Sequence, residues 1–125
     1  MGLLDSLMGN ASQVDNKIVE KELSPLLANG ETILKAFAVF RDMFIFTNKR
    51  LILADKQGLT GSKVEYHSIP YKSITHFAVE TAGTFDNDSE LKIWISGNST
   101  PIQKEFKKNT NIKDVQTMLA NCIFN

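Results

Sequence analysis

The chain lacks the paired cysteines of a disulfide framework and the long apolar runs of a membrane span. Among its 125 residues there is one cysteine, so no disulfide can form within the chain. A lone thiol fits a reducing compartment, and we therefore expect a cytoplasmic protein. The sequence contains no run approaching the roughly 20 apolar residues that a membrane-spanning helix needs.

A surplus of charge of either sign is also lacking. Fourteen Lys and Arg residues balance fourteen Asp and Glu residues, so the formal net charge is zero. This balance excludes a uniformly basic surface, although a local basic patch remains open. We expect no nucleic-acid partner, and binding to anionic membrane lipid is not favoured.

Residues that carry catalysis or bind metals are equally scarce. Both histidines lie in "KVEYHSIPYKSITHF", where Pro70 favours a turn between two strands. His67 alternates with Glu65 and Lys63, which places it on a polar strand face. No other Cys or His is close enough in sequence to complete a metal site with the histidines. We expect no cofactor and no enzymatic activity, because no Ser–His–Asp or Cys–His set has supporting context.

The N-terminal region has helical periodicity. Apolar residues recur at helical spacing over residues 12–29, and Ser12 with Asp15 resembles a capping box. Ser24-Pro25 favours a break there, because Ser is a good N-cap and Pro suits the first helical position. A shorter apolar group, Leu3, Leu4, Leu7 and Met8, also has helical spacing and could dock on its own domain or on a neighbouring subunit.

From Thr32 to Phe106 the pattern changes to strands separated by short turns. The seven predicted strands are residues 31–40, 42–47, 50–55, 64–69, 74–81, 91–96 and 101–106. Asn48 suits the tight turn of a hairpin between the second and third of them. A final helix with one apolar stripe follows Asn111.

Seven strands followed by an amphipathic helix predict a mainly β fold. A closed or nearly closed antiparallel barrel removes sheet edges, and the helix could cover an open end. A sandwich with a packed helix would also fit. We predict a single domain, in which an N-terminal helical segment, residues 1–30, precedes the barrel and its C-terminal helix, residues 31–125.

Two of the strands carry apolar residues that a barrel interior does not account for. In "DMFIFT" Phe44 and Phe46 occupy one face, while Met43 and Ile45 occupy the other. In "LKIWIS" the alternation leaves Trp94 on the outer face, where Trp is a frequent interface anchor. We predict that Met43, Ile45 and Trp94 contact another subunit, unless the N-terminal segment covers them.

One loop contains alternating carboxylates. Asp86, Asp88 and Glu90 form a DxDxE pattern that resembles the start of a calcium loop. The glycine expected at the sixth position of such a loop is Leu91, and no flanking helices are predicted. We favour a solvated hairpin loop, with a weak cation site completed by a neighbouring subunit as the alternative.

The sequence also resembles a known family. The stretch "TNKRLILADKQGLTGSKVEYHSIPYKSITHFAVETAG", followed by "FDNDSELKIWISG", closely resembles the bacterial pleckstrin-homology-like domain family from about Ile33 to Phe106. The resemblance implies a seven-stranded PH-like barrel capped by the C-terminal helix, and ring-shaped homo-oligomers, expected to be pentamers. It implies no enzymatic activity, and it leaves the physiological role open.

Two functions follow from these observations. The first is a non-enzymatic, self-assembling binding or scaffold module with an unidentified protein partner. The alternative is a membrane-surface module that binds anionic lipid through its few clustered lysines, Lys104, Lys107 and Lys108.

Overall fold

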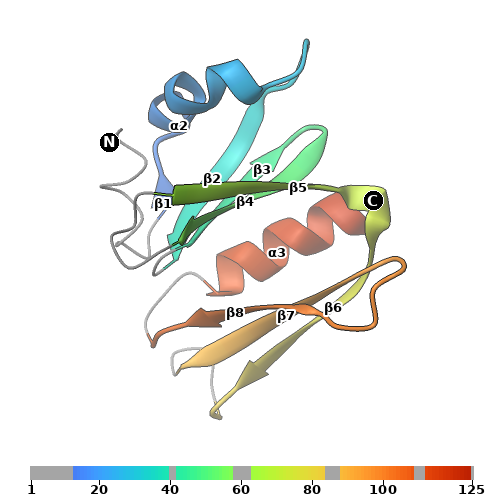
Figure 1. The fold of residues 1–125 in the computed structure, drawn as a ribbon. Coiled ribbons are helices and arrows are strands. Elements are labelled where there is room, and N and C mark those ends of the chain that lie inside the picture. Colours follow the sequence, from blue (N-terminus) through green and yellow to red (C-terminus); the bar gives the residue numbers. More distant parts are fainter. Residues whose placement is uncertain (1–12, 40–41, 58–62, 84–87, 109–111, 125) are drawn as a thin grey trace. The chain divides into compact units, whose positions relative to one another are not determined.

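The computed structural model describes residues 13–39, 42–57, 63–83, 88–108 and 112–124 of the chain. It divides into two compact units, residues 1–69 and 70–125. Each unit is built around one antiparallel sheet, and Figure 1 labels the elements of both. The fold is therefore mainly β, as predicted. Over the described residues the strands form two antiparallel sheets that do not close into one barrel, and the sandwich alternative is compatible with them.

The sheet of the first unit has five strands in chain order. They are β1 (Gln13–Val14), β2 (Ile33–Val39), β3 (Asp42–Thr47), β4 (Arg50–Gln57) and β5 (Lys63–Pro70). β1, a two-residue strand paired with β2, lies where the sequence predicted the start of a helix. The Asn48 hairpin between β3 and β4 is confirmed, and the side-chain Oδ1 of Asn48 accepts a hydrogen bond from the Thr32 amide at 2.8 Å.

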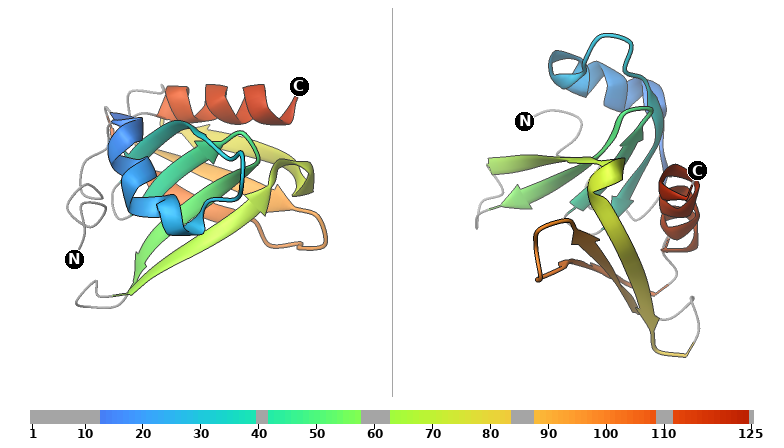
Figure 2. Two further views of the ribbon diagram at one scale, coloured as in Figure 1. Left: turned by 90° about the horizontal axis from the view of Figure 1, so that it is seen from above. Right: turned by 90° about the vertical axis from the view of Figure 1, so that its right-hand side faces the viewer.

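The N-terminal helix is shorter than predicted. α2 (Asn16–Leu23) begins after Asp15, whose side chain accepts a hydrogen bond from the Lys17 amide and caps the helix. It ends at the predicted break, where a single 3-10 turn, η1 (Ser24–Leu26), carries Pro25. Figure 2 shows α2 lying over one face of the five-stranded sheet.

The face of the sheet under α2 forms a hydrophobic core with the helix. Val19 and Leu23 of α2 are fully buried in it, together with Met43 and Ile45 of β3. The remaining buried members of the cluster are Val14, Ile33, Ala36, Ala38, Ile52 and Ala54. The two-sided apolar pattern of β3 therefore has an explanation within one chain, because its α2 side is packed against the chain's own helix.

A buried ion pair joins the end of this helical region to the sheet. The Glu31 side chain has no exposed surface, and its two oxygens accept hydrogen bonds from Arg50 Nε at 2.8 Å and Nη2 at 3.0 Å. The Ala28 amide and the Thr47 hydroxyl donate to the same carboxylate. Arg50 also donates to the Leu26 carbonyl oxygen, and so ties η1 to β4. The hydrogen bond from Arg50 is the main cause that lowers the pKa of Glu31 from 4.5 to about 2, although burial alone would raise it.

The second unit begins with a 3-10 turn, η2 (Tyr71–Ser73), and contains a three-stranded sheet. The strands β6 (Ile74–Thr81), β7 (Ser89–Ile95) and β8 (Ile102–Phe106) pair in chain order. Helix α3 (Ile112–Ile123) follows, and three of its residues, Ile112, Val115 and Leu119, are fully or almost fully buried. Phe124, just beyond α3, stacks on Phe77 of β6 with ring centroids 5.7 Å apart.

The predicted strands are therefore present as β2 to β8, with β1 added before them. The final helix is also confirmed. Among the described residues no helix is long and apolar enough to cross a membrane.

Candidate interaction face on the second sheet

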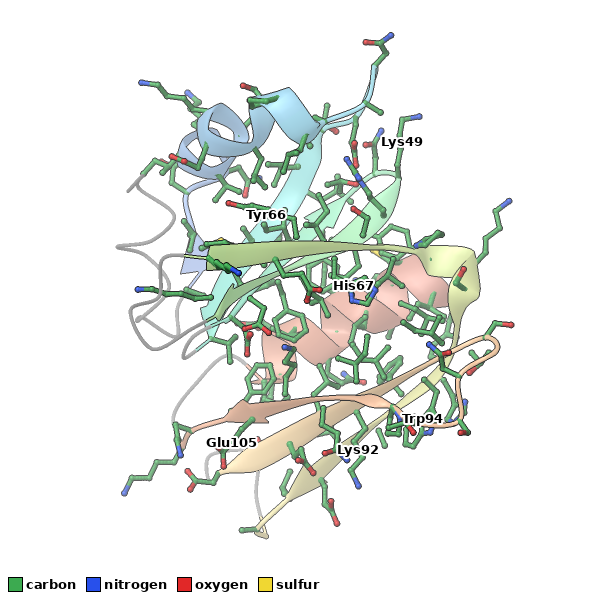
Figure 3. All side chains as sticks on the ribbon, in the orientation of Figure 1. Lys49, Tyr66, His67, Lys92, Trp94 and Glu105 are labelled. Atoms are coloured by element: carbon green, nitrogen blue, oxygen red, sulfur yellow. The ribbon has the colours of Figure 1, made fainter. Side chains whose placement is uncertain are left out.

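The three-stranded sheet has one buried face and one open face. On β7, Leu91 and Ile93 are fully buried, whereas Glu90, Lys92 and Trp94 alternate with them and keep partial exposure. This confirms the alternation that placed Trp94 opposite Leu91 and Ile93. We define the Trp94 face as the open side of the sheet, formed by His76, Ala78, Glu80, Glu90, Lys92, Trp94, Gln103 and Glu105. Figure 3 labels Lys92, Trp94 and Glu105 on this sheet.

One end of the Trp94 face carries an aromatic pair. His76 and Trp94 lie opposite each other on β6 and β7, and their rings stack with centroids 4.4 Å apart and planes 14° apart. The Thr75 hydroxyl lies 3.3 Å from the Trp94 carbonyl oxygen and 3.0 Å from Nδ1 of His76. Because a hydroxyl has one proton, donating it to the carbonyl leaves Thr75 to accept from Nδ1–H. The pair is thus held in place while its outer surface stays open.

The other end carries three glutamates in register. Glu80, Glu90 and Glu105 lie directly opposite one another across the three strands. Like charges in this position destabilise a sheet. Lys92 offsets part of the repulsion, with its Nζ 3.4 Å from Glu80 and 4.0 Å from Glu90. Nζ of Lys107 lies 3.3 Å from Glu105. Such exposed pairs contribute little, so this end remains an acidic surface.

Glu80, Glu90 and Glu105, which we call the acidic row, border a shallow hollow of about 290 Å³. Its lining consists of Glu80, Asp88, Ser89, Glu90 and Glu105. The hollow is therefore lined mainly by carboxylates. It is suited to groups that carry positive charge rather than to phosphate or other anions.

The structure describes only two of the three carboxylates in the predicted cation loop, Asp88 and Glu90. The carboxylate of Asp88 accepts a hydrogen bond from the Lys108 amide at 2.7 Å, and Glu90 lies in the acidic row of β7. Asp86 lies outside the described residues. Within the described ranges, no three or more His, Cys, Asp or Glu side chains are grouped so that they could hold a metal ion.

The three predicted interface residues have different surroundings. Met43 and Ile45 have no exposed surface, so neither offers contact area to a second subunit. The prediction for these two rested on an outward apolar face, and that face is packed within the chain's own first unit. Trp94 keeps the partial exposure that an interface anchor needs.

Sequence reasoning did not find the glutamate row or the His76–Trp94 stack. Glu80, Glu90 and Glu105 are separated by loops of different length, and only the strand register brings them together. An alternation analysis assigns each residue to a face. It does not say which residue of the neighbouring strand stands opposite.

Comparison with known proteins identifies the family. The family model described as the bacterial PH domain matches residues 2–123. The chain belongs to the bacterial PH domain family. The chain is also similar to the uncharacterised protein YjqA of Bacillus subtilis (strain 168), with 56% identity over 121 residues, covering 96% of this chain and 97% of YjqA.

Two crystal structures of bacterial PH domains resemble this one. The pleckstrin homology domain from Shewanella amazonensis SB2B is 56% identical, with a TM-score of 0.84, and the match covers 99% of this chain and all of that one. A protein with a pleckstrin-homology domain from Shewanella loihica PV-4 is also 56% identical, with a TM-score of 0.78, covering 92% of this chain and 98% of the other. The PH-like fold expected from the sequence is thereby confirmed.

Proposed function

We propose that this bacterial PH domain is a non-enzymatic, cytoplasmic binding module that assembles with copies of itself through the Trp94 face. The observation that supports the proposal is the partly exposed Trp94 side chain, whose ring stacks on exposed His76 on a face of β6 and β7 that keeps partial or full exposure along its length. Trp is enriched among the few residues that dominate interface energies. A fixed ring also loses little conformational freedom on binding.

A ring assembly needs two different surfaces on each subunit, one for each neighbour. The Trp94 face supplies one of them in this proposal. The family resemblance favours a ring of five, which for a 14.0 kDa chain would have a mass of about 70 kDa. Such an assembly would act as a scaffold for a protein partner.

The test is the solution mass by light scattering after size-exclusion chromatography, over a range of protein concentrations. We expect a single species several times heavier than 14.0 kDa for the natural chain. Trp94→Ala should lower that mass while circular dichroism stays unchanged. The matched control is Leu34→Ala, which removes a 42% exposed apolar side chain from the first unit and should leave the mass unaltered.

Two outcomes would overturn the proposal. A natural chain of 14.0 kDa at every concentration would remove self-assembly altogether. An unchanged mass for folded Trp94→Ala would remove the Trp94 face from the interface.

The membrane-surface alternative makes a different prediction. The acidic row on the Trp94 face repels anionic lipid, so binding would have to use another surface. Co-sedimentation with vesicles containing anionic lipid, at low and at high salt, separates the two functions. The scaffold function predicts no sedimentation at either salt concentration, whereas salt-sensitive sedimentation would favour the membrane.

A further inference from the structure

The two sheets end in edge strands of very different length. Within the described residues β5 is the last strand of the first sheet, and β6 is the first strand of the second and pairs only with β7. Both strands have eight residues, whereas the edge strand β1 has two and β8 has five. An edge strand presents a row of backbone N–H and C=O groups to which another chain can pair. Among the described strands, β5 and β6 therefore offer the longest edges for an added strand.

The edge of β6 lacks the residues that usually protect one. Proteins blunt sheet edges with Lys, Pro or very short strands. β6 contains neither Lys nor Pro, and its one register shift lies at its start. The Ala82 amide, directly after β6, donates to the Asp88 carbonyl oxygen, directly before β7, at 3.3 Å. Alternation along an antiparallel ladder then turns the backbone groups of Phe77 and Val79 away from β7, toward the edge.

The charges of β5 match those of β6 in one register. Lys63 is the only lysine of β5 and lies at its start, while Glu80 is the only acidic residue of β6 and lies near its end. Antiparallel pairing with Lys63 opposite Glu80 aligns nearly the whole length of both strands. Parallel pairing with the same contact would leave only the ends of the strands side by side. A shift of two residues that brings Glu65 opposite Glu80 would set like charges against each other, which destabilises a sheet.

The apolar side chains of the two strands fit in the same register. Val64 comes to lie opposite Val79, and Tyr66 opposite Phe77. Pairs of β-branched and of aromatic residues are among those that stabilise neighbouring strands. Tyr66, labelled in Figure 3, is 37% exposed, so its ring has surface left to bury in such a contact.

On the opposite side, the added strand would continue the Trp94 face. Lys63 would extend the acidic row by a cation, and the Glu80 side chain is 72% exposed, so it can receive this cation beside Lys92. Glu65 would lie opposite Ala78, which in turn pairs with Lys92 on β7. Two strand spacings, about 10 Å, separate the Glu65 and Lys92 backbones, and their long side chains can meet over the small Ala78.

We propose that β5 of one copy adds to the β6 edge of the next copy, antiparallel and with Lys63 opposite Glu80. The inference rests on the proposed self-assembly and names the strands that join the copies. Because β5 and β6 are different surfaces of each copy, the contact is head-to-tail and can close into a ring. His67 of the added strand then lies beside His76, so the neighbour borders the aromatic pair of the Trp94 face.

The first test is charge reversal in the full-length chain. Light scattering over a dilution series gives the protein concentration at which half of the assembly has dissociated. Lys63→Glu and Glu80→Lys each set like charges opposite each other and should each raise this concentration about tenfold. The double variant restores opposite charges and should return within about threefold of the natural value. Lys49→Glu, the same change at an exposed position in the turn between β3 and β4, is the matched control and should have no effect.

The second test is disulfide trapping of the register. In a Cys122→Ser background, Glu65→Cys combined with Ala78→Cys places thiols opposite each other in neighbouring copies. The matched control combines Glu65→Cys with Ala82→Cys, another exposed alanine four residues, or about 13 Å, further along. A disulfide needs Cα atoms within about 7 Å, so oxidation should join the Ala78 pair about tenfold faster than the control. Non-reducing electrophoresis should show a ladder of multiples of 14.0 kDa.

The outcomes separate this inference from the proposed function. An assembly that dissociates at the same concentration in both single variants, or that the double variant does not restore, would overturn the inference and leave assembly through the Trp94 face standing. A cross-linked monomer, or equal rates for the two cysteine pairs, would overturn it as well. A natural chain of 14.0 kDa at every concentration would overturn both, and would leave the β6 edge to a strand of a different protein.

Discussion

Replacing Glu31 by Gln should be among the most damaging conservative substitutions in this protein. The carboxylate is buried and receives four hydrogen bonds, two of them from Arg50. Gln keeps the size of the side chain but removes its charge, so the guanidinium loses its counter-ion. Breaking such a pair by changing one partner is costly, because it leaves the Arg50 charge without its counter-ion in a partly buried place.

The magnitude follows from the pKa of Glu31. A carboxyl group whose pKa falls from 4.5 to about 2 on folding favours the folded state by about 3 kcal/mol when it is ionised. Because the folded pKa is the lower one, this stabilisation is fully present above pH 4.5. It is lost as the pH falls toward 2. Glu31→Gln should therefore lower the free energy of unfolding by about 3 kcal/mol at pH 7.

Urea unfolding followed by circular dichroism at pH 7, 4.5 and 3 measures this effect. With a slope of about 2 kcal/mol per molar urea, the midpoint at pH 7 should fall by about 1.5 M. The gap between the natural chain and Glu31→Gln should narrow as the pH decreases, because protonation neutralises the natural side chain. Glu80→Gln is the control, since its side chain is 72% exposed and its pair with Lys92 is open to solvent. A gap that stays constant from pH 7 to 3, or a loss below about 1 kcal/mol at pH 7, would refute the reasoning.

Further predictions concern packing, charge and assembly. Leu23→Ala removes a fully buried α2 side chain and should lower the free energy of unfolding in urea by about 2–5 kcal/mol. Leu26→Ala, at a half-exposed position, should lower it far less, and similar losses for the two variants would mean that α2 does not pack as described. Glu90→Gln removes the central charge of the acidic row and should raise the free energy of unfolding by about 0.5 kcal/mol, with a larger increase at low salt. A lower free energy of unfolding would show that the Glu90–Lys92 ion pair outweighs the repulsion among the three glutamates. Trp94→Ala should lower the mass of the assembly, with the Leu34→Ala control given above.

Most of the secondary structure could be predicted from the conformational preferences of residues close together in the sequence. Asn48 marks a hairpin because it tolerates the backbone conformation of a tight turn, and Pro25 marks the helix break because it suits the first helical position. Alternation on β7 correctly separated Leu91 and Ile93 from Trp94. These signals depend on residues within a few positions of one another, so a single sequence contains them in full.

Which residues form the Trp94 face, and which of them are neighbours, could be predicted from the sequence only in part. Trp94 could be assigned to the open side of its strand from alternation alone. Its stack with His76 and the alignment of Glu80, Glu90 and Glu105 depend on register between strands. Register depends on turn geometry and on how the buried face packs, and neither can be read from the residues of one strand.

The sequence by itself determined the mainly β class, the positions of the seven long strands and the final helix, because propensity, periodicity and turn chemistry are local. Only the tertiary structure decided what covers each apolar face and which charges meet. It placed Met43 and Ile45 within the chain's own core, joined Glu31 to Arg50 across nineteen residues, and arranged the strands as two sheets. The physical reason is that burial and charge pairing are properties of contacts between distant segments, and those contacts exist only once the chain has folded.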